Sequence, residues 1–352
     1  MDRFIGLDAH SQTCTVAVMG PSGKHILEKV VETNAKMLTE LVRSVGGQRH
    51  LCTEEGTHAE WLYEILERHV ERIVVVQPPK STGRKSDSID AWALADMIRK
   101  NDIEKAVFKA PGMYTALREA VRGHQVVLRD MVRAKSRVKA IYRSRGLQGM
   151  GQAVYEPEKR NEWLCKLPPH RRQLAELLSD ELDGLIKMHE KAEKWLLEQA
   201  SRCPEVKRLA SAPGIGPIRA AQIVATVITP TRFRTKQQFW SYCGLGIVMR
   251  SSSDWVRGRD GEWTRKEATQ TRGLNPNRQP LLKAIFKGAA MTVIQHMPKH
   301  PLHADYQRTI EAGTRPNLAA VTLARRIASA VLAMWRNKEV YDPAKHRRPD
   351  AA

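Results

Sequence analysis

The sequence has 352 residues, with 58 Lys and Arg against 38 Asp and Glu, a formal net charge of +20 and a pI near 10. This charge favours a polyanionic partner, either nucleic acid or an anionic membrane surface, and nucleic acid is the class we expect. No apolar run approaches the roughly 18 residues of a membrane span, and no secretory signal is evident. Five cysteines without CxxC spacing argue against a cysteine zinc site or disulfides, so we expect a protein of a reducing cytoplasm.

Residues 1–108 alternate strand and helix signals. Strand-like runs at residues 4–7, 13–18 and 25–31 are followed by a helix that Asn34 can cap. A short strand at 50–53, a helical pattern at 61–70, a buried strand at 72–76 and a helix starting at Ser86 or Asp87 complete the segment. Three strands followed by alternating helices and strands predict an α/β domain, and this order matches a ribonuclease-H-like sheet.

Four acidic residues in this segment stand where a metal-dependent nuclease needs carboxylates. Asp8 and Glu54 end two of the strand-like runs, and Asp87 and Asp90 lie three residues apart at a helix start, on one helix face. Such oxygen ligands suit magnesium, and two ions about 4 Å apart would stabilise the attacking and leaving oxygens of a phosphodiester displacement.

The same residues have simpler explanations. Acidic residues at a helix start commonly serve as caps and compensate the helix dipole, which could account for Asp87 and Asp90. Glu55 could replace Glu54 as the ligand, because adjacent side chains point differently. His10 and His58 lie close to the acids, where an imidazole could move protons, bind metal or simply be a surface residue.

Residues 109–203 are predicted to be helical and coiled-coil-like. Apolar residues recur at spacings of three and four in two long stretches, separated by breakers at 146–151 and 157–169, which predicts two antiparallel helices. The first helix has nine Lys or Arg between residues 118 and 145 and only two acids, so phosphate contact competes with a merely solvated face. The candidate nucleic-acid contacts on it are Arg122, Arg129, Arg133, Arg137 and Lys139.

Residues 204–340 are predicted to be a mostly helical domain, followed by a basic tail at 341–352. The turn Pro213-Gly214-Ile215-Gly216-Pro217 before a helix fits a helix-hairpin-helix element, in which the amides of Gly214 and Gly216 could hold a DNA phosphate; a plain corner in the core is the alternative. Polar and turn-rich sequence then leads to helices at 280–296 and 317–336.

Taken together, these motifs resemble the DEDD transposases of bacterial insertion sequences, a group related to the Piv-type invertases and described as bridge-RNA-guided recombinases. The matching stretches occur in the family's order: Ile5–His10, Glu54–Thr57, Lys85–Ala91, Pro213–Pro217 and Tyr242–Leu245.

The resemblance implies a RuvC-like domain of ribonuclease-H type, a helical coiled-coil spacer and a C-terminal transposase domain. It implies a magnesium-binding tetrad of Asp8, Glu54, Asp87 and Asp90, and a C-terminal serine that forms a covalent phosphoserine link to DNA. The family's proline and final glycine are absent from the serine stretch, and the register from Gly244 favours Ser252, with Ser251 next.

The implied partners are donor and target DNA, a structured noncoding bridge RNA that reads sequence by base pairing, and further copies of the chain in a dimer or tetramer. A tetrad from one subunit and a serine from another would form a composite site. Two other hypotheses remain: a RuvC-like hydrolytic nuclease acting on branched DNA, in which the tetrad suffices, and a basic architectural or RNA-binding protein without activity.

Overall fold

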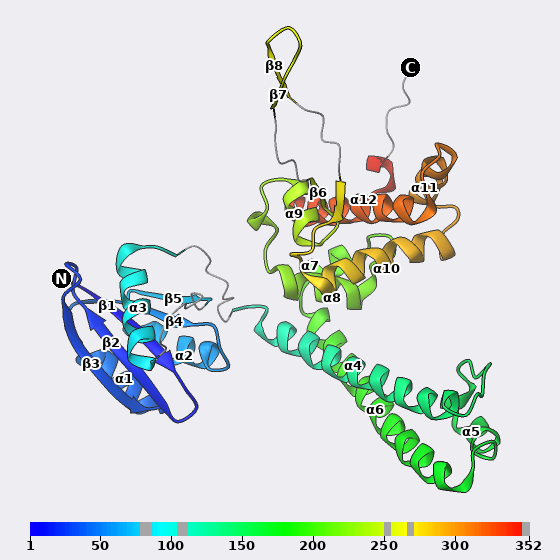
Figure 1. The fold of residues 1–352 in the computed structure, drawn as a ribbon, viewed down its shortest axis with the longest axis horizontal. Helices are drawn as coiled ribbons and strands as arrows, with labels where there is room; N and C mark the ends of the chain where they lie inside the picture. The colour runs from blue at the N-terminus through cyan, green and yellow to red at the C-terminus, as the bar shows by residue number, and fades with distance from the viewer. Residues whose placement is uncertain (78–85, 104–111, 250–254, 266–270, 347–352) are drawn as a thin grey trace. The chain divides into compact units, whose positions relative to one another are not determined.

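The structure is a computed structural model that describes residues 1–77, 86–103, 112–249, 255–265 and 271–346 (Figure 1). The chain divides into two compact units, residues 1–113 and 114–352. The first is a mixed α/β unit and the second is mostly helical, as the sequence predicts. Within the predicted basic tail, side chains are described as far as Lys345. The predicted boundary at residue 203, between the helical spacer and the C-terminal domain, stays a prediction.

The first unit is built on a five-stranded sheet. The order is β3-β2-β1-β4-β5, formed by β1 (Asp2–Ala9), β2 (Thr13–Met19), β3 (His25–Glu32), β4 (Gln48–Glu54) and β5 (Arg72–Val76). β1, β2 and β3 are antiparallel neighbours, whereas β4 pairs parallel with β1 and with β5. This unit also contains α1 (Ala35–Ser44), α2 (Ala59–Leu66), a 3₁₀ turn (Glu67–His69) and α3 (Asp87–Lys100).

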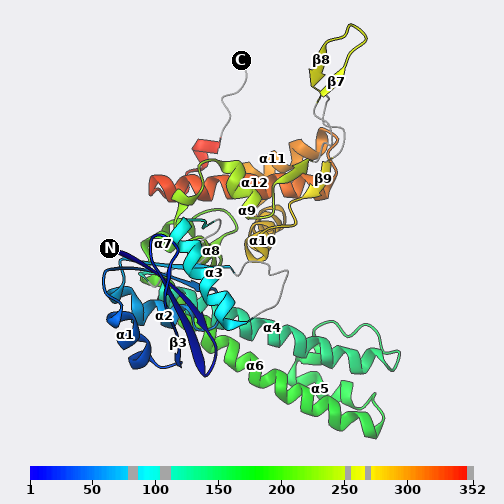
Figure 2. The same cartoon turned by 60° about the vertical axis from the view of Figure 1, so that its left-hand side comes forward.

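Helices cover both faces of this sheet (Figure 2). Side chains of α1 and α2 form one core with Ile5, Leu7 and other strand residues. On the opposite face, Leu94 and Ile98 of α3 pack on Cys52 of β4 and on Val74 and Val76 of β5. Because successive residues of a strand point to opposite faces, β1 sends Ile5 and Leu7 toward α1 and α2, and Gly6 and Asp8 toward α3.

The second unit begins with an antiparallel helical hairpin. Its long helices are α4 (Thr115–Arg143) and α6 (Pro169–Ser201), which pack along each other and are joined through a 3₁₀ turn (Ala153–Tyr155) and α5 (Pro157–Leu164) (Figure 1). The two predicted long helices are confirmed, but most of the predicted breaker at 157–169 is itself helical, because Pro157 occupies the first turn of α5.

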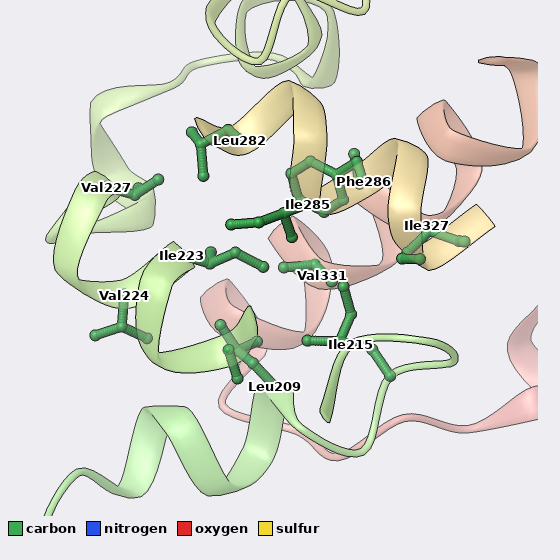
Figure 3. Packing of buried hydrophobic residues seen from close by; sticks show 14 of the residues in the cluster. Leu209, Ile215, Ile223, Val224, Val227, Leu282, Ile285, Phe286, Ile327 and Val331 are labelled. Carbon is green, nitrogen blue, oxygen red and sulfur yellow. The ribbon is translucent and has the colours of Figure 1, made fainter. Parts of the chain in front are cut away.

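The remaining helices surround one apolar core (Figure 3). They are α7 (Pro204–Leu209), α8 (Gly216–Val227), α9 (Lys236–Tyr242), α10 (Pro280–His296), α11 (Pro301–Glu311) and α12 (Pro316–Asn337), with 3₁₀ turns at Pro230–Arg232 and Pro343–His346. Leu117, Val121 and Leu196 of the hairpin join this core, so one end of α4 and α6 is continuous with the helical body.

Several elements of this unit were not predicted. They are the short helices α5, α9 and α11 and two short antiparallel ladders, β6 (Ile247–Met249) with β9 (Thr271–Leu274) and β7 (Trp255–Arg257) with β8 (Trp263–Arg265). In addition, α12 is long and apolar enough to cross a membrane by length and composition, contrary to our expectation that no run of this kind exists. Its buried Leu323, Ile327 and Val331 belong to the apolar core, which is the behaviour of a core helix.

Candidate active site

Two of the predicted carboxylates end adjacent parallel strands on the same face of the sheet. Leu7 pairs with Thr53 in the register of β1 and β4, so the next residues, Asp8 and Glu54, lie side by side where these strands end. Glu54 shares the α3 face with Cys52 because side chains alternate along β4. Glu55 follows on the opposite pleat and is exposed, which favours Glu54 over Glu55 as the ligand.

Helix α3 brings the other two carboxylates to this face. The Ser86 side chain accepts a hydrogen bond from the Ile89 amide at 3.3 Å, so Ser86 is the N-cap and Asp87 and Asp90 lie in the first turn. The helix lies very close to β1: a Cβ built on Gly6 would be 1.9 Å from the carbonyl oxygen of Ala91. A glycine opposite the helix backbone therefore sets the distance between the helix and Asp8.

His10 links the strand and the helix. Its Nε2 is 3.3 Å from Oδ2 of Asp8 and 3.4 Å from Oδ1 of Asp87. Potential ligand atoms of the three residues all lie within 4.8 Å of one another. The Asp8 side chain is 8% exposed, whereas those of His10 and Asp87 are more than half exposed, so one side of the group opens to solvent. His58 instead packs edge-on to Trp61.

The local electrostatics fit a divalent cation. Burial raises the pKa of Asp8 above its ordinary value, and the negative charges of Asp87 and Asp90 raise it further, while His10 acts in the opposite direction. Crowded carboxylates with one buried member are unfavourable without positive charge, and hard oxygen ligands are the donors that magnesium prefers. The donor set therefore suits a divalent ion, and His10 is a nitrogen donor beside it.

Four of the predicted nucleic-acid contacts line one exposed face of α4. Arg122, Arg129, Arg133 and Arg137 are seven, four and four residues apart, which keeps them on one side of a helix, and all four are exposed. Arg133 pairs with Asp130 at 3.2 Å and Arg137 with Glu181 of α6 at 2.8 Å, so part of this charge is already neutralised.

Lys139, the fifth predicted contact, lies apart from this face. Its Nζ is 5.1 Å from the ring centroid of Tyr155, so it makes a cation–π contact within the hairpin.

The glycine turn before α8 is closely packed. Gly214 has φ +72°, and a Cβ there would be 2.5 Å from the Ala289 carbonyl oxygen of α10. The guanidinium of Arg219 donates to the Gly214 carbonyl and, at 3.1 Å, to the hydroxyl of Thr292. Gly216 has φ +61° with open space around it, so of the two predicted phosphate-binding glycines only Gly216 is in a position free of neighbouring backbone.

The predicted nucleophile Ser252 and its alternative Ser251 lie outside the described residues. The preceding Gly-Leu element is fixed firmly. Leu245 is fully buried, and the Arg325 guanidinium of α12 donates to its carbonyl oxygen at 2.7 Å. The indole of Trp240 donates to the Arg325 carbonyl at 3.1 Å, which ties α9 to the same point. Arg325 of α12 therefore joins α9 to the Gly-Leu element.

Two family models match the chain in order. One, for DEDD proteins and described as "Transposase", matches residues 5–144, and the other, described as "Transposase IS116/IS110/IS902 family", matches residues 206–307. The chain belongs to the IS110/IS116 family of transposases. The first match contains all four candidate carboxylates, and the second contains the glycine turn and the serine stretch. The predicted resemblance to DEDD transposases of insertion sequences is thereby confirmed.

Relatives support this assignment over most of the chain. It is 25% identical over 301 residues to a "Probable family 20 transposase" of Pseudomonas aeruginosa, an alignment covering 82% of this chain and 84% of that protein. It is 22% identical over 400 positions to the "Insertion element IS116 uncharacterized 44.8 kDa protein" of Streptomyces clavuligerus, covering 97% and 96%. As a transposase, the IS110/IS116-type chain is a DNA-cutting and DNA-rejoining enzyme, and its DEDD family is consistent with use of a divalent metal.

Proposed function

We propose that this transposase cuts and rejoins DNA with Asp8, Glu54, Asp87 and Asp90 as a magnesium-binding tetrad in a RuvC-like unit. The carrying observation is the convergence of two parallel strand ends and the first turn of α3 on one face of the sheet. The strand order β3-β2-β1-β4-β5 supports the ribonuclease-H-like assignment.

Each of the four residues has a distinct position in this proposal. Buried Asp8 is the central ligand, Glu54 flanks it on β4, and Asp87 and Asp90 complete the set from α3. A bound magnesium ion would supply Lewis acidity and charge neutralisation at the scissile phosphate. His10, in contact with Asp8 and Asp87, orients both carboxylates and can take up a proton beside them.

We further propose that Ser252 is the nucleophile. Its hydroxyl oxygen forms a bond to the scissile phosphorus while the bond from phosphorus to one DNA oxygen breaks; the serine proton passes to a base, and the departing oxygen takes up a proton to leave as a hydroxyl. In the second step a hydroxyl of the other DNA strand attacks the phosphoserine and the serine is released. The phosphoserine ester replaces the broken DNA phosphodiester with a bond of similar energy, so rejoining requires no added energy source.

The exposed arginine face of α4 is proposed to contact nucleic acid backbone. Arg122 and Arg129 on this face have no acidic partner among the ion pairs of the described residues, and a helical row of cations suits a phosphate backbone. A structured bridge RNA paired to donor and target DNA is the proposed guide, and a dimer or tetramer would combine the tetrad of one subunit with the serine of another.

A covalent-adduct assay tests the mechanism. Purified protein, magnesium, donor and target DNA, and RNA transcribed from the flank of the element are incubated, denatured and separated by mass. We expect a protein–DNA adduct that is lost in Ser252→Ala and in Asp8→Asn but kept in Ser201→Ala, a matched exposed serine on α6. Cleavage without any adduct would instead identify a hydrolytic nuclease that uses the tetrad alone.

A further inference from the structure

A polar layer interrupts the apolar seam between α4 and α6. Along α4, buried Leu117, Val121, Ala134 and Val138 follow the three–four spacing of a coiled-coil seam, and His124 occupies a position in this series. On α6 the corresponding series passes through positions 182, 189, 193, 196 and 200, which places His189 and Glu193 in the seam.

These three side chains meet across the two helices. The ring centroids of His124 and His189 are 4.8 Å apart, and Nδ1 of His189 is 3.9 Å from Oε2 of Glu193. One potential ligand atom from each of His124, His189 and Glu193 lies within 4.8 Å of the other two. The 3.9 Å separation is too long for a hydrogen bond, so direct hydrogen bonding between His189 and Glu193 does not account for the layer.

His124 is the residue that most needs an explanation. It is 4% exposed, and its Nδ1 is buried without a hydrogen-bond partner. An unsatisfied buried polar atom destabilises a fold, so this ring in an apolar seam calls for a partner. Burial and the neighbouring His189 lower the pKa of His124, which keeps the imidazole neutral and its lone pair available.

We propose that His124, His189 and Glu193 bind a zinc-type divalent ion that joins α4 to α6. Two imidazole nitrogens and one carboxylate oxygen are a common zinc ligand set, with water completing a tetrahedron. Ligand atoms about 2.1 Å from a tetrahedral ion lie roughly 3.4 Å from one another. Side-chain rotations that move the ligand atoms by about 1 Å would therefore bring them to these distances. An ion here would satisfy His124 and fix the register of the hairpin.

This site is separate in sequence and chemistry from the tetrad. The tetrad lies in residues 1–113 and is made of carboxylates, whereas the hairpin site lies in residues 114–352 and contains two histidines. A nitrogen-rich site prefers zinc or cobalt over magnesium, so metal identity distinguishes the two.

Zinc titration of the metal-free full chain tests the proposal. Chelator-treated wild type, His189→Gln and Glu193→Gln are titrated with Zn²⁺ by calorimetry, with His170→Ala, an exposed histidine on the same helix, as the control. We expect wild type and His170→Ala to bind one more equivalent than the other two. Even outer-shell changes weaken metal binding about 10–100-fold, so losing a direct ligand should weaken this site by at least ~100-fold.

Cobalt gives a second readout. Co²⁺ bound by two imidazoles and a carboxylate absorbs visible light, and this band should vanish in His189→Gln. Both glutamine variants retain a polar side chain of similar size at partly exposed positions, so folding is preserved and a negative result is interpretable. Equal zinc stoichiometry and affinity in wild type, His189→Gln and Glu193→Gln would overturn the proposal and leave a metal-free polar layer that only sets helix register.

Discussion

Replacing Gly6 by alanine tests how the spacing between β1 and α3 controls the candidate site. The added Cβ would lie 1.9 Å from the Ala91 carbonyl oxygen and 2.5 Å from the Ala95 nitrogen. Both neighbours are helix backbone, which cannot rotate aside as a side chain can. Since nonbonded atoms of this kind need a separation of roughly 3 Å or more, strand and helix must move apart by more than about 1 Å.

The expected magnitudes follow from this displacement. Overpacking of a buried contact destabilises by about 1–3 kcal/mol, which for a unit of 113 residues lowers Tm by roughly 4–12 °C. The same movement carries Asp87 and Asp90 away from Asp8, and a misplacement of about 1 Å in a catalytic constellation costs roughly 100-fold in rate.

Thermal unfolding and adduct formation measure the two effects separately. Gly46→Ala is the control, because Gly46 is exposed in the same unit and an added Cβ there meets nothing within 4 Å; its stability should stay within about 0.5 kcal/mol of wild type. Wild-type Tm in Gly6→Ala would refute the packing argument. A lowered Tm with undiminished adduct formation would refute the link between α3 and catalysis.

Two further predictions concern charge. Because folding raises the pKa of Asp8 above its ordinary value of 3.8, the ionised carboxylate destabilises the metal-free fold, and stability falls as pH rises above 3.8. In metal-free buffer, Asp8→Asn should therefore raise Tm at pH 7 and leave Tm unchanged below pH 3.8, as measured by calorimetry. Magnesium should raise Tm in the wild type only. Arg122→Gln and Arg129→Gln should each weaken duplex binding and reduce the slope of log affinity against log salt concentration by roughly 0.9, measured by fluorescence anisotropy. Arg202→Gln, at the residue that follows α6 and is already paired with Glu198, should change neither.

The sequence predicted the elements of the first unit because each has a strong local signal. Asn34 accepts from the Lys36 amide at 2.8 Å and Ser86 caps α3, as their positions before apolar periodic runs predicted. Asp8 and Glu54 could be placed at strand ends, and parallel pairing then brings strand ends to one edge.

The rest depended on contacts that no local pattern encodes. The sequence around Gly6 does not indicate that Ala91 and Ala95 lie against it, because that contact depends on how α3 crosses the sheet. Likewise, the short ladders β6–β9 and β7–β8 pair only three or four residues each and are flanked by turn-rich sequence, so their strand signal is weak. The polar layer at His124 was missed since a histidine in an apolar series resembles any other core histidine.

The division of the chain raises one last testable consequence. The candidate carboxylates lie within residues 1–113 and the candidate serine within residues 114–352, so a subunit could complete its site with its own serine or with that of a partner.

Asp8→Asn and Ser252→Ala are each expected to be inactive alone. If sites are composite, an equal mixture forms heterodimers in which one of the two sites combines an intact tetrad with an intact serine, and adduct should return to about a quarter of the wild-type level. If each site is built within one subunit, every site in the mixture carries a lesion and no adduct should form. The two variants are mixed, refolded together and assayed, and adduct is quantified on each kind of subunit. Adduct confined to the Asp8→Asn chain would show that the serine acts in trans.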